Sequence, residues 1–430
     1  MNRKEHRAEQ GDSVPGEAGR ARPRLRALDP KLIEHQGRDF LYLRDPLSLS
    51  DDNVLVPSPL VPLLALCDGT RDLAGLRSAF ALRTGIEMGD GHLIGLIERL
   101  DSALLLEGPK FDAAAAHALG EYRSAPYRIP FHAGAVYPEG PAELREMLAR
   151  FCEAAPAASV GGAGGRLVGM LSPHIDFARG GRTYAQTWQA AVADLGGIER
   201  AIVLGTDHMG GPATLTLTGQ NYSTPLGTLA TDVEVVGRLA GILGVDEAYR
   251  EELHHRSEHS IELASVWMHS FLESREPRLV PILCGSFSGF VAGNGHPKDS
   301  LVLDRAIDVL AAAAAERQTL LIAAADLAHV GPVFGDAAPV GSAARHGLEL
   351  HDQKSLAAVC AGDAAGFLDL SIREEDRRRI CGLSPIYLML EVLRRAHGAP
   401  TSGLAMGYDQ CPADEDGGSL VSIAGALLYA

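Results

Sequence analysis

The sequence predicts an α/β protein with a mostly parallel, helix-covered sheet, preceded by a small winged-helix-like α+β domain. Two observations support this fold class. From residue 128 onwards, apolar segments of strand length alternate with amphipathic segments of helix length. Before that point, residues 27–110 hold short apolar strands around two short helices. Repeated strand–helix alternation joins parallel strands through crossover helices, which then cover both faces of the sheet.

We expect four parts in the 430-residue chain. Residues 1–26 are charged, rich in Arg, Glu, Gly and Pro, and lack the apolar segment of a secretory signal, so a disordered tail is predicted. Residues 27–110 form the winged-helix-like module. Residues 111–127, alanine-rich and then polar, form a linker, and residues 128–430 form the larger α/β domain.

The charge balance argues against a nucleic-acid partner. Residues 27–110 carry eight Lys and Arg against thirteen Asp and Glu, a balance of −5, and the whole chain has a formal net charge of −16. A nucleic-acid phosphate backbone attracts the opposite sign. Apolar runs stay shorter than the roughly 18 residues of a membrane span. The six cysteines are scattered without a C-x-x-C pair, which favours a reducing, cytoplasmic setting.

The larger domain contains segments for five strands and five helices. The strands are expected at residues 166–172, 200–205, 278–284, 319–324 and 421–429. The helices are expected at residues 141–154, 183–194, 231–243, 302–315 and 385–397.

Polar side chains follow three of these strands. His174 and Asp176 come after the first strand, His208 after the second, and Asp326 and His329 after the fourth. The carboxyl ends of parallel strands meet at one edge of a sheet, where open α/β sheets place their binding sites. The sequence therefore predicts a shared metal-binding or proton-transferring site at this edge.

Cys381 is a further candidate for this site. It precedes a helix that Ser384 and Pro385 open and Gly398 ends, and a thiolate is favoured near a helix N-terminus. A thiolate together with imidazoles suits iron, copper or zinc. An inert, buried cysteine fits the same position equally well.

The densest polar cluster contains the pattern His255-x-x-Glu258-His259, which inverted zinc peptidases use. If this stretch were helical, its two imidazoles would lie on one face. The alternative is a charged helix start, in which Glu258, His259 and Glu262 support the site by hydrogen bonds.

The order of motifs from Arg128 resembles the Memo family, including the Memo-like component of the AmmeMemoRadiSam system. The family's fold is similar to that of LigB-type class III extradiol dioxygenases, which are non-haem iron enzymes. The matching blocks are His132-Ala-Gly134 with Tyr137, Ser172-Pro-His174, Leu204-Gly205 with His208, Thr224–Leu229 with Asp232, Glu258–Glu262, Val280–Gly285, Asp326–His329, Cys381-Gly382 with Pro385-Ile386, and Ser419–Tyr429. The pattern of Leu66–Leu73 resembles PqqD-like winged-helix modules, which bind peptides.

The resemblance implies a mononuclear site with a divalent metal ion, Fe(II) favoured and Cu or Zn as alternatives. Its ligands fall on His174, His208 and Cys381. Asp326 and His329 match the family's Asp-x-x-His pair, and with His259 they are the catalytic candidates. The implied partners are a radical-SAM enzyme, an AMMECR-type protein and a peptide for the N-terminal module.

The sequence also departs from the family pattern. His174-Ile-Asp-Phe177 stands for His-Ala-Gly-Tyr, which brings Asp176 near the site as an extra carboxylate. Thr206-Asp-His208 stands where the family has Ser-His-His, which leaves open which residue binds the metal. Ala324-Ala325-Asp326 stands where the family has Ser-Ser-Asp, which removes two hydroxyls. LigB enzymes supply a carboxylate where Memo proteins supply a cysteine, so extradiol cleavage does not carry over.

Three functional hypotheses follow from the sequence. The first is a non-haem iron redox or dioxygenase-type enzyme that acts with a radical-SAM-based modification system. The second is a non-catalytic partner that binds a metal or a peptide. The third is the zinc peptidase.

Overall fold

The computed structural model describes residues 22–28, 30–155, 165–272, 277–397 and 402–430. Most of the predicted tail, residues 1–21, lies outside the described residues. The chain divides into two compact units, Met1–Gly120 and Glu121–Ala430. Helix α4 (Pro109–Ser124) occupies most of the stretch predicted as a linker.

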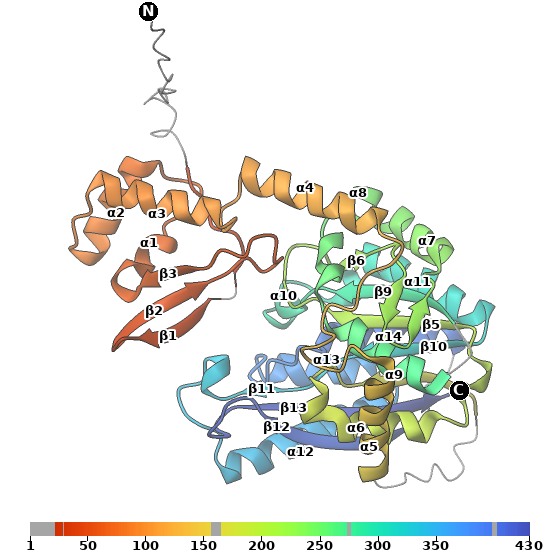
Figure 1. Ribbon diagram of the computed structural model, residues 1–430. Helices are drawn as coiled ribbons and strands as arrows, with labels where there is room; N and C mark the ends of the chain where they lie inside the picture. The colour runs from red at the N-terminus through yellow and green to blue at the C-terminus, as the bar shows by residue number, and fades with distance from the viewer. Residues whose placement is uncertain (1–21, 29, 156–164, 273–276, 398–401) are drawn as a thin grey trace, which may run out of the picture. The chain divides into compact units, whose positions relative to one another are not determined.

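The N-terminal unit combines a three-stranded antiparallel sheet with short helices (Figure 1). Its strands, in the order β1-β2-β3, are β1 (Lys31–His35), β2 (Arg38–Leu43) and β3 (Val54–Pro57). Its helices are η2 (Ser58–Leu60), α1 (Val61–Leu64), α2 (Leu73–Thr84) and α3 (Asp90–Ser102).

Local sequence explains how α2 begins and ends. The Asp72 side chain accepts a hydrogen bond from the backbone N–H of Gly75, 2.8 Å away, so Asp72 caps the helix. Gly85 ends the helix in the left-handed region, at φ 73°. Leu76 and Phe80 on its inner face are fully buried.

The C-terminal unit is built on one eight-stranded mixed sheet in the order β11-β13-β4-β10-β5-β9-β6, with β12 paired to β13. The strands are β4 (Leu167–Ser172), β5 (Arg200–Thr206), β6 (Leu215–Leu217), β9 (Arg278–Cys284), β10 (Thr319–Ala324), β11 (His329–Val330), β12 (Ser402–Pro412) and β13 (Leu420–Tyr429). A separate hairpin joins β7 (Tyr222–Thr224) and β8 (Gly227–Leu229). The predicted α/β class is confirmed. The parallel arrangement holds for the four central strands, β4, β10, β5 and β9, whereas the outer strands pair antiparallel.

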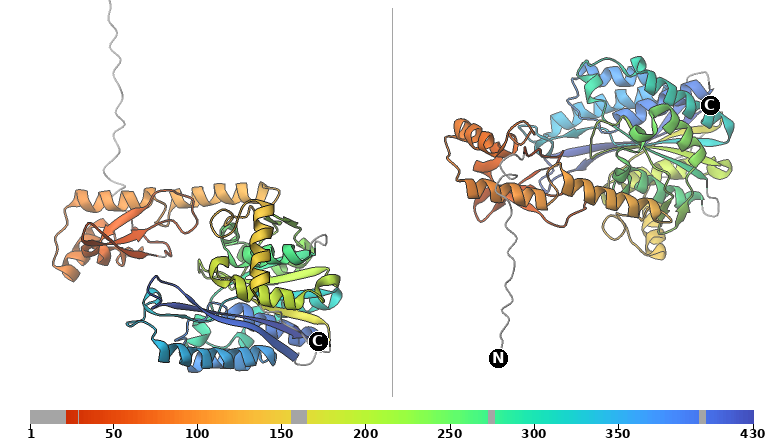
Figure 2. Two further views of the ribbon diagram at one scale, coloured as in Figure 1. Left: turned by 60° about the horizontal axis from the view of Figure 1, so that its bottom comes forward. Right: turned by 90° about the horizontal axis from the view of Figure 1, so that it is seen from above.

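Helices cover both faces of this sheet (Figures 1 and 2). The α-helices are α5 (Pro141–Ala154), α6 (Phe177–Ala191), α7 (Val233–Leu243), α8 (Val245–Ala248), α9 (Ser260–Leu272), α10 (Ser288–Val291), α11 (Leu301–Glu316), α12 (Ser342–Cys360), α13 (Ala364–Arg373) and α14 (Leu383–His397). The 3-10 segments are η3 (Leu195–Gly197), η4 (Glu252–Arg256), η5 (Pro297–Asp299) and η6 (Pro332–Phe334). One apolar core lies under α5, α6 and α9, and a second lies under α7, α11, α13 and α14.

The strand register places the candidate site. Ala324 at the end of β10 lies opposite Ser172 of β4 on one side and Gly205 of β5 on the other. The segments that follow these three strands therefore emerge side by side at one edge of the sheet. This agrees with the prediction, made from the histidines that follow these strands, that they meet at one edge of the sheet.

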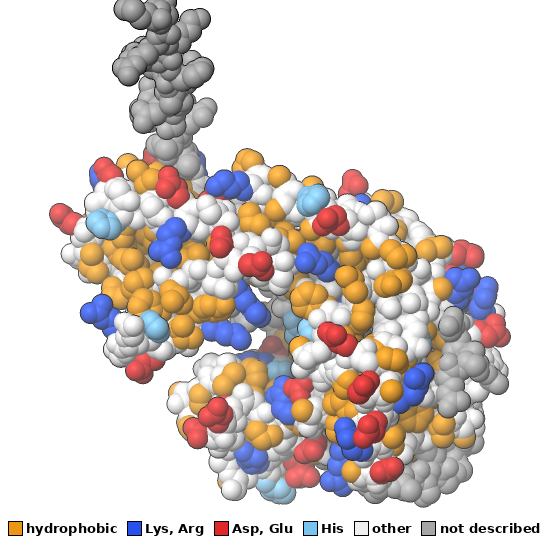
Figure 3. Space-filling view, viewed as in Figure 1, with side chains coloured by type: hydrophobic (Ala, Val, Ile, Leu, Met, Phe, Trp, Pro, Cys, Tyr) orange, Lys and Arg blue, Asp and Glu red, His pale blue; other side chains and the backbone are white. Residues whose placement is uncertain are grey.

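Among the described helices, none combines the length and the apolar composition that a membrane crossing requires. On the face of the N-terminal unit seen in Figure 3, the Lys and Arg side chains lie scattered among acidic and apolar side chains. No continuous basic surface forms on that face of the described residues.

Candidate metal centre

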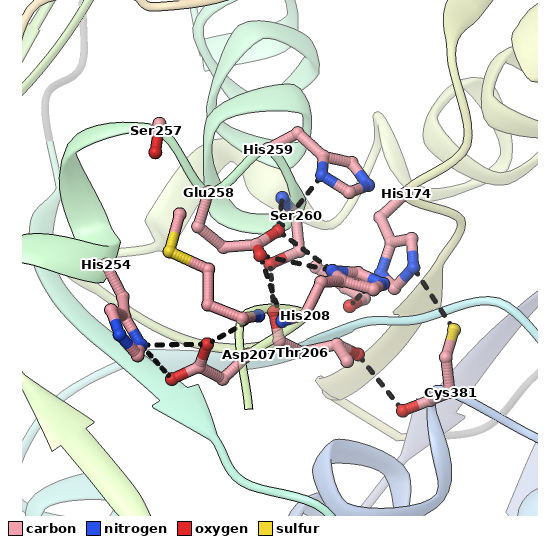
Figure 4. A network of polar contacts seen from close by, with 12 residues as sticks. His174, Thr206, Asp207, His208, His254, Ser257, Glu258, His259, Ser260 and Cys381 are labelled. Atoms are coloured by element: carbon pink, nitrogen blue, oxygen red, sulfur yellow. Dashed lines mark hydrogen bonds and ion pairs between the residues drawn. The ribbon is translucent and has the colours of Figure 1, made fainter. Parts of the chain in front are cut away.

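Three imidazoles and one thiol meet at the sheet edge. Ring nitrogens of His174, His208 and His259 all lie within 4.8 Å of one another. The Sγ atom of Cys381 lies 3.2 Å from Nε2 of His174. The four side chains turn toward a common point in Figure 4. All four lie in separate sequence blocks, so only the fold brings them together.

His174 follows β4 and is held from two sides. Its Nδ1 lies 2.8 Å from the carbonyl oxygen of Ala324, and its backbone N–H donates to Oδ1 of Asp326 at 2.8 Å. Since a carbonyl only accepts, Nδ1 carries a proton, and Nε2 is the ring nitrogen that faces Cys381. The residue is 1% exposed, so burial and these two contacts fix the ring orientation.

Glu258 orients the other two imidazoles. Its carboxylate lies 3.1 Å from Nδ1 of His208 and 3.1 Å from Nδ1 of His259. It also accepts from the backbone N–H of Ser260 at 3.0 Å. A carboxylate behind a metal-binding histidine fixes its tautomer and raises its basicity, which leaves Nε2 for the metal.

Cys381 reaches the site because α14 approaches the end of β10 closely. A Cβ on Gly382 would lie 2.5 Å from the carbonyl oxygen of Asp326, so only glycine permits this approach. The hydroxyl of Thr206, at the end of β5, donates to the Cys381 carbonyl at 3.2 Å. The predicted strand ends and the predicted helix start thus meet at one place.

Electrostatics favour a thiolate beside charged imidazoles in the metal-free site. Burial opposes the charge on His174, yet the charges of Asp326 and Cys381 raise its pKa to about 9. Burial also opposes the thiolate of Cys381, but the His174 and His329 charges hold its pKa well below the usual range. For His208, the Glu258 carboxylate outweighs burial and raises the pKa. A divalent cation would replace the protons on these groups.

Asp326 and His329, the predicted catalytic pair, lie beside this cluster. Asp326 is 1% exposed, and its Oδ2 lies 3.7 Å from Nε2 of His174. His329 opens β11, and its ring packs against Phe334 with centroids 5.0 Å apart. The His329 charge acts on the Cys381 thiol, and His329 lies outside the group of three imidazoles.

Asp176 does not add a carboxylate to the site. Its side chain accepts from the backbone N–H of Arg179 at 3.1 Å and pairs with the Arg179 guanidinium at 2.6 Å. The residue is the N-cap of α6, and capping turns its carboxylate toward the first helical turn. The expectation of an extra donor here was wrong.

The peptidase pattern is also not realised. His255 lies in the 3-10 segment η4, and α9 begins only at Ser260, so His255 and His259 do not share a helix face. Both ring nitrogens of His255 are engaged, Nδ1 with the Tyr222 hydroxyl at 2.6 Å and Nε2 with the Thr216 carbonyl at 2.9 Å. A fully buried imidazole with both nitrogens in hydrogen bonds has no lone pair for zinc.

Sequence reasoning missed the residues beside His208. Asp207 turns away from the imidazoles and lies 2.8 Å from Nδ1 of His254, with Glu251 close to both. The only local signal was the aspartate itself, which stands where the family motif has a histidine.

The residues fit a divalent metal. In each imidazole of the cluster Nδ1 contacts a carbonyl or a carboxylate, which leaves Nε2 as the nitrogen that could bind the ion. The family model described as "Memo-like protein" matches residues 128–427. The chain belongs to the Memo family. This match contains all three imidazoles, Cys381 and the Asp326–His329 pair, so the sequence-based resemblance is confirmed.

Several MEMO1 family proteins are similar to this Memo-family chain. One from Aquifex aeolicus is 25% identical over 411 residues, covering 95% of this chain and 100% of that protein. One from Thermus thermophilus is 27% identical over 331 residues, covering 76% of this chain and 92% of that protein. One from Thermococcus onnurineus is 30% identical, covering 48% and 67%. The Aquifex alignment is longer than the matched family region, so it also extends over residues of the N-terminal unit.

Proposed function

We propose that this Memo-family protein holds one divalent metal ion, Fe(II) favoured, between His174, His208 and Cys381, and that it is a non-haem redox or dioxygenase-type enzyme. The observation that supports the proposal is the 3.2 Å approach of the Cys381 thiol to Nε2 of His174, inside a group of imidazoles within 4.8 Å of one another. Mixed sulfur and imidazole donors bind iron, copper and zinc.

A cavity next to the cluster supports an enzymatic rather than a purely structural metal. It has a volume of about 190 Å³ and reaches both His208 and Cys381. The residues that line its other walls include Ser286, Ser288, Ser384 and Asp376. Structural metal sites are closed, whereas catalytic ones keep a position open toward such a space.

The chain's own residues then take distinct roles. A bound iron would supply Lewis-acid and redox chemistry. Glu258 holds His208 and His259 by their Nδ1 atoms, and Asp326 holds His174 by its backbone N–H. His259 lies in the cluster with its Nδ1 against Glu258, and the His329 charge acts on the Cys381 thiol. These two imidazoles are the groups placed to carry protons to or from a substrate.

Metal analysis of protein purified without oxygen tests the proposal. We expect about one iron per chain in the wild type and a trace in the His174→Ala/Cys381→Ala variant. The matched control is His346→Ala/Cys360→Ala, which removes the same residue types outside the cluster and should keep the iron. Equal metal in the wild type and the site variant would show that the ligands are assigned wrongly. His259→Ala separates the roles, since a proton carrier can be removed with the iron retained.

A second candidate function is that of a partner-binding protein, in which residues of the N-terminal unit bind a peptide or another protein whether or not the metal site is catalytic. The observation that favours it is strand β1, which among the described strands pairs only with β2 and leaves its other edge open. An open edge can accept a peptide as an added strand. In this proposal residues 27–110 dock a peptide, and a radical-SAM enzyme and an AMMECR-type protein are the partners.

Deletion of residues 1–110 tests the partner proposal separately from the metal site. We expect the truncated protein to lose capture of the radical-SAM partner and to retain its metal. Unchanged capture would count against docking by this module. Lost metal together with lost capture would show that the deletion damages the larger unit, and substitutions along β1 would then replace the deletion.

A further inference from the structure

We propose that Asp207, Glu251 and His254 form a second divalent-metal site, separate from the imidazole–thiol cluster. One donor atom from each lies within 4.8 Å of the other two. Asp207 comes from the end of β5, Glu251 precedes η4, and His254 lies within η4. Asp207 is 6% exposed, and the other two are partly buried. The three residues share no side chain with the first cluster.

The two sites lie on opposite sides of one strand end. Asp207 and His208 are consecutive, and their side chains diverge. His208 turns toward His174, whereas Asp207 turns toward His254 on the side away from Cys381 (Figure 4). Occupation of one site therefore requires no donor from the other.

A buried carboxylate oxygen without a hydrogen-bond partner supports a cation site here. Among the described residues, Oε2 of Glu251 is buried and has no hydrogen-bond partner. The carboxylate fits only because Gly211 lies against it, where a Cβ would come within 1.9 Å of Oε1. Burying a carboxylate oxygen without a donor is costly, and a cation is one way to satisfy it.

Hydrogen bonding inside the cluster does not account for this oxygen. Nδ1 of His254 lies 2.8 Å from Oδ2 of Asp207, and the backbone N–H of Met209 donates to Oδ1 at 3.1 Å. These contacts satisfy Asp207 and His254 but leave Glu251 Oε2 unmatched. A metal between the three groups would engage both carboxylates and the imidazole at once.

The donor set indicates the class of metal. Two carboxylates and one imidazole suit Zn²⁺ or Mn²⁺, whereas Ca²⁺ takes six to eight oxygens and Cu(I) prefers sulfur. Zinc bonds of about 2.0–2.2 Å place tetrahedral donors about 3.3 Å apart. Nδ1 of His254 and Oδ2 of Asp207, 2.8 Å apart, would open slightly around the ion, and the Glu251 carboxylate, within 4.8 Å of both residues, would complete the set. Three protein donors leave a fourth position for water.

Zinc binding to the full-length protein tests the second site. After removal of metal, we expect calorimetric titration with Zn²⁺ alone to give two sites in the wild type and one in Glu251→Gln. In the His174→Ala/Cys381→Ala background we expect one remaining site, and adding Glu251→Gln should weaken it at least tenfold. Glu247→Gln is the matched control, since this nearby exposed carboxylate pairs with Arg250 outside the cluster.

The outcomes separate the second site from the first. Equal Zn²⁺ stoichiometry in the wild type and Glu251→Gln would overturn the second site, as would a first-site variant that folds and binds no zinc. If substitution at the first site prevents folding, the comparison between the wild type and Glu251→Gln still decides. Loss of iron from the first-site variant bears only on the proposed function.

Discussion

The Sγ atom of Cys381 lies 3.2 Å from Nε2 of His174, although 207 positions separate the two residues in the chain. The thiol comes from Cys381, two residues before α14 begins at Leu383, and the imidazole comes from the segment after β4. Their contact therefore depends on how closely α14 packs against the end of β10. Gly382 marks a close point of this packing, since a Cβ added there would meet the Asp326 carbonyl and the Ala325 side chain.

Gly382→Ala should therefore impair the site through packing alone. A Cβ would lie 2.5 Å from the Asp326 carbonyl and 2.6 Å from the Ala325 Cβ, which displaces Cys381 from His174. We expect a loss of about 1–3 kcal/mol in the free energy of unfolding and a lower iron content. Gly237→Ala is the control, because a Cβ there meets nothing within 4 Å in a helix. Urea unfolding and metal analysis check both variants, and full iron content in Gly382→Ala would contradict the argument.

Glu258→Gln should weaken metal binding without unfolding the protein. The carboxylate holds two imidazoles by Nδ1, and removing such a supporting group typically costs about 10–100-fold in metal affinity. Competition with a chelator measures this affinity. Glu247→Gln should leave it unchanged. Zinc-dependent proteolysis in the wild type that Glu258→Gln abolishes would instead revive the peptidase hypothesis.

His255 should make stability pH-dependent. Burial lowers the pKa of its imidazole to about 3 in the folded protein, and the nearby Arg128 charge acts in the same direction. Between that value and the unfolded pKa of about 6.5, the unfolded chain binds more protons, so acid destabilises the fold. The contribution is present above about pH 6.5 and is lost as pH falls toward 3, at up to about 1.4 kcal/mol per pH unit.

Urea unfolding across the range from about pH 7 to pH 5 isolates this contribution. We expect the stability of His255→Gln to fall less steeply with acid than that of the wild type, because glutamine can still meet the Tyr222 hydroxyl without binding a proton. Parallel curves for the two proteins would mean that His255 does not cause the dependence.

The sequence predicted the strands and the histidines that follow them because each is marked by a short continuous segment of the chain. The apolar segments of β9 and β10 end where the sequence places them, and the parallel register then brings His174 and His208 together. Strand β12 (Ser402–Pro412) escaped prediction because its glycines and polar residues interrupt any alternation. Its backbone pairing with β13 over ten residue pairs stabilises the strand, although its sequence shows no alternation of apolar and polar residues.

The remaining site residues depend on contacts between distant segments. Cys381 became a favoured ligand through the family resemblance, since a free cysteine before a helix is often inert. The grouping of Asp207 with Glu251 and His254 depends on how η4 packs against the end of β5. Asp176 showed the opposite error, because a residue near the site in sequence became a helix cap. Short-range spacing cannot distinguish these outcomes.

Arg128 should be the costliest single residue to remove near the site. It is 1% exposed, lies 2.7 Å from the equally buried Glu262, and donates to the Glu258 carbonyl at 2.9 Å. Arg128→Met would leave the Glu262 carboxylate buried without its partner, which typically costs 3–5 kcal/mol. Arg150→Met is the matched control, since its pair with Glu146 is exposed and contributes at most about 0.5 kcal/mol. Urea unfolding measures both losses, and equal stability of the two variants would show that breaking the buried Arg128–Glu262 pair does not carry this cost.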